Sequence, residues 1–238
     1  AAWVSGLTSN CLYKVNLLTV MTQGSAAVTS YCNIFPFSSG LIGNLAGGPI
    51  GNLVAGGLVW TTTRYNSGDA VASLNPSTSA VAVYYYPSAT TEFGDISTDG
   101  SKLYMAEYQK IVVFNPTTST FSSISTAPCT PNFIYHDGPL LRFTCDSPYG
   151  FGYVNADGTG LFIFTTGSQG RFITKDGSGN LWFSSNSAHT LSKCPSPCNS
   201  ASPITTYPTG MLSDGPFGIV ATTSGIWLII IRWPMISR

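Results

Sequence analysis

Three features of the 238-residue sequence predict an all-β fold built from repeated four-stranded sheets. Short apolar segments alternate with turns rich in Gly, Pro, Ser, Asn and Asp, and the i, i+3, i+4 spacing of an amphipathic helix is not sustained anywhere. Asn75, Asn115 and Asn155 lie 40 residues apart, each at the end of an apolar segment. A period near 40 residues with four strands per unit is typical of β-propeller blades, whereas the alternative, a β-sandwich, needs no equal spacing.

The clearest repeat runs from Arg171 to Tyr207 and contains every part of one predicted blade. A short apolar strand (RFITK) leads into an Asp-Gly turn, a Trp-centred strand (LWFSS), a polar loop and two more short strands. The same order recurs from Phe93 to Thr126 and from Phe133 to Thr166, with Asp-Gly turns at 99–100, 137–138 and 176–177. These stretches predict three complete blades.

Less regular blades are expected on either side. AWVSG, LYKVN and AVTSYC predict three strands near the start, and LVWTTT, AVASLNP and AVAVYYYP predict three more. The Gly-rich stretch 38–57 is expected to be a connector with one strand at 52–55, and PFGIVATTSG and IWLIII predict two strands of a last blade. Six blades with incomplete terminal blades are favoured over five, in one domain with repeats at 1–48, 49–92, 93–130, 131–168, 169–215 and 216–238.

The six cysteines fall into three pairs that are local in sequence. Each of Cys11 with Cys32, Cys129 with Cys145, and Cys194 with Cys198 lies within one repeat. A zinc site is the alternative, but only the last pair is closely spaced, and no second close pair accompanies it. Disulfides indicate an oxidising compartment, so we expect a secreted or cell-surface protein. The small residues at positions 1 and 2 fit the product of signal-peptide removal.

The charge content limits the possible partners. Ten basic and ten acidic residues cancel, and charged residues make up 8% of the chain, against about 25% in typical proteins. Nucleic acids and anionic membranes need clustered Lys and Arg, so neither is an expected partner. The longest apolar run, Ile226 to Ile231, is too short to span a bilayer. Weak charge repulsion favours self-association, so a homo-oligomer or filament is the expected assembly.

Two stretches carry a family resemblance. DGSGNLWFSSNSAHTLSK and PFGIVATTSGIWL resemble the repeat of streptogramin-lyase-like (virginiamycin B lyase-like) propellers. The match is good at 172–183 and 216–227, partial at 93–116 and 132–159, and poor before Gly48. The resemblance implies a propeller fold. Active lyases of this family use a His-containing, magnesium-assisted site at one mouth of a ring that usually has seven blades. This chain is short for seven, and no residue here matches that site, so the resemblance supplies no catalytic residue.

Polar residues recur where the second strands end and where the first strands begin. In a propeller these positions open on one mouth of the central channel and suit a polar ligand. A simpler interpretation is that loops collect polar residues. His189 is a conceivable general base, whereas His136 is expected to cap a turn; no G-x-S-x-G or HExxH motif occurs, and we expect no metal or cofactor. The candidates are Arg64, Glu92, Glu107, Asn132, Asp146, Arg171 and His189.

Aromatic residues suggest an interaction surface. Side chains alternate between the two faces of a strand, so at least one of Tyr84, Tyr85 and Tyr86 is expected to point outward. Trp233 lies in an apolar tail that is expected to dock on this chain or on a neighbour. Three functions follow: a structural protein that self-associates, a lectin-like module that binds glycans through an exposed Tyr, or a metal-assisted lyase or hydrolase. We favour the first, which is not an enzyme.

Overall fold

The protein is described from a computed structural model of the chain. The structure describes residues 2–5, 11–15, 28–32, 42–46, 57–65, 68–87, 93–166, 169–185, 187–199, 202–210, 218–222 and 225–229. The chain divides into two compact units, residues 1–125 and 126–238, and each is described by itself. The predicted single domain stays a prediction. The described part contains strands and no helix, so it includes no helix that could cross a membrane.

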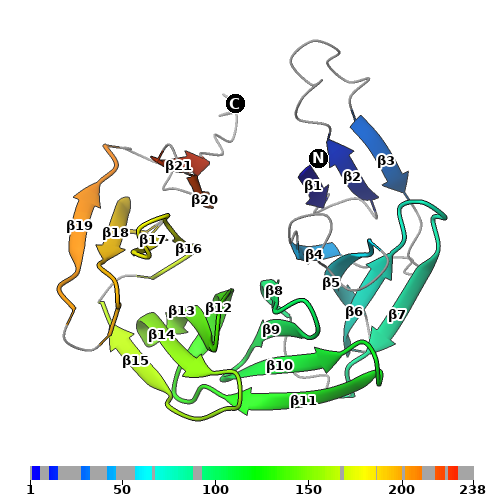
Figure 1. Ribbon diagram of the computed structural model, residues 1–238, viewed down its shortest axis with the longest axis horizontal. Coiled ribbons are helices and arrows are strands. Elements are labelled where there is room, and N and C mark those ends of the chain that lie inside the picture. The colour runs from blue at the N-terminus through cyan, green and yellow to red at the C-terminus, as the bar shows by residue number, and fades with distance from the viewer. Residues whose placement is uncertain are drawn as a thin grey trace, which may run out of the picture. The chain divides into compact units, whose positions relative to one another are not determined.

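The described residues of unit 1 form three antiparallel sheets (Figure 1), and in each of them strands that are consecutive in sequence are neighbours in the sheet. The first sheet has three strands and the other two have four each. The strands are β1 (Ala2–Ser5), β2 (Cys11–Val15) and β3 (Val28–Cys32); β4 (Ile42–Ala46), β5 (Val59–Tyr65), β6 (Gly68–Leu74) and β7 (Val81–Tyr85); and β8 (Ile96–Thr98), β9 (Leu103–Glu107), β10 (Lys110–Asn115) and β11 (Thr120–Ser125).

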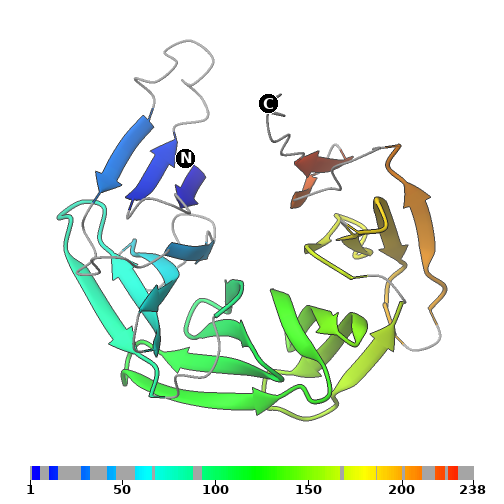
Figure 2. The ribbon, with the colours of Figure 1, turned by 180° about the vertical axis from the view of Figure 1, so that it is seen from behind.

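Unit 2 repeats this arrangement with two four-stranded sheets and, in the described residues, a final two-stranded sheet. The sheets β12–β15 and β16–β19 are neighbours in both views of the unit (Figure 1, Figure 2). The strands are β12 (Thr130–Asp137), β13 (Leu140–Ser147), β14 (Tyr149–Asn155) and β15 (Phe162–Thr165); β16 (Ile173–Lys175), β17 (Leu181–Ser185), β18 (Thr190–Cys194) and β19 (Thr205–Pro208); and β20 (Gly218–Thr222) and β21 (Gly225–Ile229).

These sheets confirm the predicted all-β architecture of six four-stranded repeats with incomplete terminal sheets. One strand lies elsewhere than expected. The first strand of the second sheet is β4 at Ile42–Ala46, which pairs with β5, so this sheet begins within the predicted repeat 1–48. The expected strand at 52–55 lies outside the described residues. Gly-rich sequence gives little contrast between strand and connector, which is why its pattern did not locate β4.

Aromatic side chains fill the space between neighbouring sheets. In unit 1, Trp60 of β5 and Tyr84 of β7 pack against Phe114 of the next sheet, with ring centroids 5.8 and 4.7 Å from that of Phe114. In unit 2, Phe151 of β14 lies 4.6 Å from Phe183 of β17, centroid to centroid. In each unit a four-stranded sheet therefore packs against the next sheet in the sequence, which is the stacking that a 40-residue repeat requires.

The Asp of each Asp-Gly turn accepts a hydrogen bond from the second strand of its own sheet. Tyr104 Oη donates to Asp99 Oδ2 at 2.8 Å, and Trp182 Nε1 donates to Asp176 Oδ2 at 2.8 Å. Arg142 Nε donates to Asp137 Oδ2 at 2.7 Å in the equivalent place. The turns therefore recur at fixed spacing because each carboxylate fastens the strand that follows it.

The three predicted disulfides are present. Cys11–Cys32 joins β2 to β3, Cys129–Cys145 joins the segment before β12 to β13, and Cys194–Cys198 closes a loop after β18. No free cysteine occurs among the described residues. Local pairing follows from the fold, because each pair lies within one sheet or beside it.

Candidate functional site

The ends of the second strands are built alike in the sheets β16–β19 and β8–β11. The Ser184 amide donates to the Phe172 carbonyl at 3.0 Å, and the Arg171 amide donates to the Ser184 carbonyl at 2.7 Å. In unit 1 the Ala106 amide of β9 likewise donates to the Asp95 carbonyl at 3.0 Å, and the Ala106 carbonyl accepts from the Gly94 amide at 2.8 Å. This pattern fixes the segment that leads into each first strand, where the ligand residues were predicted.

Thr144 extends this pattern from one sheet to the next within unit 2. Its Oγ1 accepts from the Phe133 amide at 3.2 Å and donates to the Arg171 carbonyl at 3.1 Å. Thr62 makes the corresponding bond in unit 1, to the Gly94 carbonyl at 3.3 Å. A hydroxyl at this strand position therefore holds the beginning of the next sheet.

In unit 1 the predicted residues do not form a described ligand site. Glu107 ends β9 with only 2% of its surface exposed, and its carboxylate pairs with Lys110 Nζ at 3.2 Å. Burial by itself lowers the pKa of Lys110, but hydrogen bonds to Tyr86 and Glu107 raise it. Arg64 lies near the end of β5, with its side chain outside the described part, and Glu92 lies outside the described residues altogether.

In unit 2 the structure brings three of the predicted residues to one end of the β13–β14 hairpin. Asp146 accepts a hydrogen bond from Gln169 Nε2, which lies two residues before Arg171. Asn132 lies at the irregularity in the β12–β13 pairing, near the start of β12. The Arg171 side chain is half-buried, and its Nε is shielded from solvent without a hydrogen-bond partner in the described residues.

The two histidines lie in different surroundings. His189 is in the turn between β17 and β18 with a φ of 50°, and its carbonyl accepts from Thr209 N and Oγ1 at 3.0 and 2.8 Å. Its Nδ1 is buried without a partner among the described residues. His136 lies in β12 directly before the Asp-Gly turn and is half-buried. No carboxylate is placed to orient His189, so the described geometry assigns it no base role.

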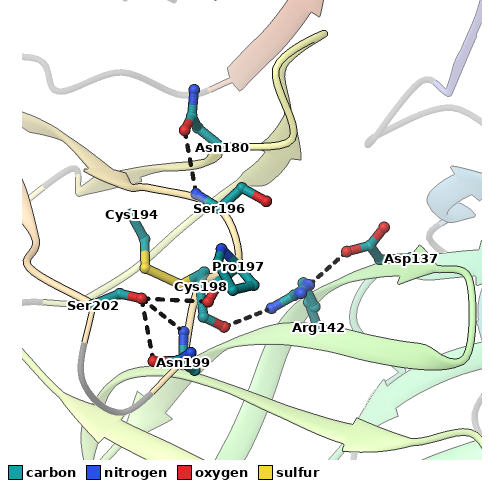
Figure 3. The surroundings of a disulfide bond; sticks show 9 residues. All are labelled: Asp137, Arg142, Asn180, Cys194, Ser196, Pro197, Cys198, Asn199 and Ser202. Atoms are coloured by element: carbon teal, nitrogen blue, oxygen red, sulfur yellow. Dashed lines mark hydrogen bonds and ion pairs between the residues drawn. A yellow bond between two sulfur atoms is a disulfide. The ribbon is translucent and has the colours of Figure 1, made fainter.

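A buried ion-pair network joins the two complete sheets of unit 2 (Figure 3). Arg142 lies between the Asp137 carboxylate and the Cys198 carbonyl, to which its Nη1 donates at 3.4 Å. Lys175 also pairs with Asp137. Burial alone raises the pKa of Asp137, but the bonds from Lys175 and Arg142 lower it overall. The network therefore seats the Cys194–Cys198 loop against the neighbouring sheet and is structural.

All acidic residues of the described part take part in hydrogen bonds or ion pairs within the chain. Asp99, Asp137, Asp157 and Asp176 accept bonds from their own turns and strands, and no described acidic residue is without a partner. No group of three or more His, Cys, Asp or Glu side chains in the described ranges is arranged to hold a metal ion. The donor set that a magnesium-assisted site needs is therefore not assembled by these residues.

The three consecutive tyrosines divide between the interior and the surface. Tyr84 packs against Trp60, and Tyr86 packs against Phe93 and Phe121, both between sheets. Tyr85 is 53% exposed on β7. Of the predicted interaction surface, Tyr85 is thus the exposed member, and Trp233 lies outside the described residues.

The sequence prediction missed three exposed tyrosines: Tyr207, which is 43% exposed on β19, and two others at turns. Tyr108 is 57% exposed in the β9–β10 turn, and Tyr149 is 49% exposed at the start of β14. Both lie at turns between second and third strands. An aromatic residue in a polar turn is unusual, and this feature of the sequence could have identified both residues.

Repeated four-stranded sheets in chain order, with neighbouring sheets stacked within each unit, are the architecture of a β-propeller. Solved structures support this class and show the fold of streptogramin lyases, as the sequence resemblance predicted. A catalytically inactive variant of virginiamycin B lyase from Staphylococcus aureus, solved with quinupristin, is similar with a TM-score of 0.77 at 16% identity, covering 96% of this chain and 73% of the lyase.

A streptogramin B lyase structure gives a TM-score of 0.75 at 16% identity, covering 96% of this chain and 72% of that one. Hydrazine synthase from Kuenenia stuttgartiensis gives 0.67 at 12% identity, covering 95% of this chain and 69% of that one. No family model and no curated protein sequence matches the chain. Since these neighbours perform different chemistries, the likeness establishes the fold and not an activity.

Proposed function

We propose that this chain is a non-enzymatic, secreted or cell-surface β-propeller that self-associates through the outer edges of its sheets. The observation that carries this proposal is the composition of the fourth strands. The sequences of β7, β11, β15 and β19 are VAVYY, TFSSIS, FIFT and TTYP, and none contains a charged residue. Natural edge strands are usually protected by charges, because an unpaired edge pairs readily with another chain.

The position and exposure of these strands agree with this role. Each lies at the end of its sheet, so one backbone edge has no partner strand in the described part of the chain. All four residues of β19 are exposed, as are four of the six in β11. Tyr85 on β7 and Tyr207 on β19 are 53% and 43% exposed, and Tyr is a frequent interface residue.

The three disulfides are consistent with an extracellular setting, where such bonds persist. The low charge of the whole sequence has the same consequence as the uncharged edges, because little electrostatic repulsion opposes contact between copies. The engaged carboxylates also favour a scaffold over an enzyme that would need a carboxylate for acid–base work.

The test is the mass of the full chain in solution by light scattering across a range of concentrations. The wild type is expected to exceed the 25.2 kDa of one chain. Tyr85→Lys and Ser123→Lys place a charge on exposed positions of β7 and β11 and should return the mass towards one chain. Ser187→Lys, in the exposed β17–β18 turn, is the matched control and should still assemble. A single-chain mass at every concentration would contradict the proposal.

A metal-assisted lyase is the second candidate; it is supported by the fold shared with the streptogramin lyases, and His189 would be its base although no described carboxylate orients it. It predicts turnover of a lyase substrate that depends on a divalent cation and disappears in His189→Ala. Activity that survives this substitution would leave the candidate without a base.

A further inference from the structure

Arg171 carries a positive charge that the described part of unit 2 does not neutralise. Arg142 and Lys175 both pair with Asp137, and Lys193 Nζ lies over an aromatic ring, 5.4 Å from its centroid. The Arg171 guanidinium has no hydrogen-bond or ion-pair partner among the described residues, and its Nε is shielded from solvent. The side chain is partly exposed, so a guanidinium without a counter-ion in the described residues can pair with an anion that comes from outside the chain.

The backbone holds Arg171 in place independently of its side chain. Its amide and carbonyl are bonded to Ser184 and Thr144, as described above. Gly170, directly before it, packs so closely that a Cβ there would lie 3.0 Å from the Gly150 carbonyl oxygen and 3.1 Å from Thr144 Cβ. The guanidinium therefore extends from a fixed point without contributing to the structure that fixes it.

The close approach of Gly150 and Gly170 also brings Tyr149 beside the segment that carries Arg171. Tyr149 pairs across β13–β14 with Asp146, which accepts the hydrogen bond from Gln169. The Tyr149 side chain is 49% exposed, and its hydroxyl makes no hydrogen bond within the described part of the chain. The residues that carry an exposed aromatic ring, a side-chain amide and an unneutralised guanidinium thus lie at one end of a hairpin.

We propose that this end of unit 2 binds a carbohydrate that carries a carboxylate, such as a uronic acid residue. The carboxylate matches the planar guanidinium of Arg171, which can donate two parallel hydrogen bonds to it. The exposed ring of Tyr149 offers a flat surface to the apolar face of the pyranose, and the Gln169 amide can bond a sugar hydroxyl. One unpaired cation suits one negative charge and not a polyphosphate, which requires several.

The test uses calorimetric titration of the full chain with three probes: an oligogalacturonate, a neutral galactose oligomer of the same length, and sodium acetate. We expect the oligogalacturonate to bind at least about tenfold more tightly than either of the others, because it alone supplies both the carboxylate and the ring. Added salt should weaken this binding.

Variants separate the two contacts. Arg171→Gln should abolish the preference for the acidic oligomer over the neutral one, and Tyr149→Ala should weaken the acidic oligomer while leaving acetate unchanged. Lys193→Gln, which removes a partly exposed cation elsewhere in the same unit, is the control and should bind like the wild type. Since Tyr149 is exposed, its variant is expected to fold even where Arg171→Gln does not.

Three results would overturn the proposal. Equal binding of the acidic and neutral oligomers would show that the charge of Arg171 does not contribute. Equal binding of acetate and oligogalacturonate would show that the ring of Tyr149 does not contribute. No binding of any probe to the wild type would remove the site. None of these outcomes bears on self-association through the fourth strands, so the two proposals fail separately.

Discussion

In three sheets, a side chain of the second strand donates a hydrogen bond to the Asp of the preceding Asp-Gly turn. This bond keeps the turn and the strand at a constant spacing in the repeat. Tyr104, Arg142 and Trp182 have different side chains, yet each donates to the Asp of its own turn. Trp60 occupies the same strand position, but the sequence has Ala55 five residues before it, and its Nε1 is buried without a partner in the described residues. Among the described residues, the bond between turn and second strand is therefore not present at Trp60, next to the Gly-rich stretch 38–57 in which the repeat was hardest to recognise.

Removing one of these bonds should lower stability measurably. Tyr104→Phe takes the hydroxyl from the 2.8 Å bond to Asp99 and leaves the ring, so the free energy of unfolding is expected to fall by about 1.5 kcal/mol. Urea denaturation measures the change. Tyr108→Phe is the control, since Tyr108 is exposed and its hydroxyl makes no hydrogen bond in the described part. Equal effects of the two substitutions would show that the bond contributes nothing specific.

Candidate site residues were predictable at this scale only by position. The repeat alignment placed Asp146 and Arg171 at the correct end of their sheets, because strand order and turn spacing are properties of local sequence. It gave no means to foresee that Glu107 is buried against Lys110 or that Arg171 has no counter-ion. Those facts depend on which side chains arrive from segments distant in the sequence.

At the scale of elements, glycines decide how closely neighbouring strands approach. A Cβ on Gly150 of β14 would overlap the Phe164 carbonyl oxygen of β15. A side chain at this position therefore forces the two strands apart, and the clash is with backbone, which cannot rotate away.

Gly150→Ala is accordingly expected to destabilise the protein by about 3 kcal/mol or more through the loss of β14–β15 pairing. Thermal unfolding followed by circular dichroism measures this loss. Gly177→Ala is the matched control, because a Cβ there meets nothing within 4 Å. Unfolding of both variants at the wild-type temperature would show that β14 and β15 do not lie too close together for a side chain at position 150.

Element positions were predictable wherever apolar and polar residues alternate between clear turns. This pattern located the strands of the three central sheets, as well as β1 to β3, β20 and β21. It misplaced β4, whose residues (IGNLA) carry no such alternation. That strand is defined by its pairing with β5, which is a tertiary property.

For the whole molecule, the paired carboxylates predict how stability depends on pH. Burial alone raises the pKa of Asp99, but bonds from the Lys102 and Ser101 amides and from Tyr104 lower it from 3.8 to about 2. Burial alone also raises the pKa of Asp176, but the bonds from Trp182, Asn180 and Ser178 together lower it from 3.8 to about 2. Both groups bind protons more weakly when folded, so their contribution is complete above pH 4 and is lost as the pH falls towards 2.

The urea midpoint should therefore be nearly constant from pH 6 to about 4 and decline steeply below about pH 4. Combining Asp99→Asn with Asp176→Asn should make this decline shallower, because two of the titrating groups are gone. Urea titrations at half-unit intervals of pH measure both slopes. A steep decline that is unchanged in the double variant would assign the acid sensitivity to other groups.

The sequence by itself determined the strands, their grouping into sheets, the Asp-Gly turns, the disulfide pairs and the lyase-like propeller fold. These follow from the alternation of side chains along a strand and from turn chemistry, which act over a few residues and repeat. The tertiary structure decided which tyrosines are exposed, where β4 pairs, and that Arg171 is left without a counter-ion among the described residues. Burial and charge pairing depend on neighbours that only packing of one sheet on the next brings together.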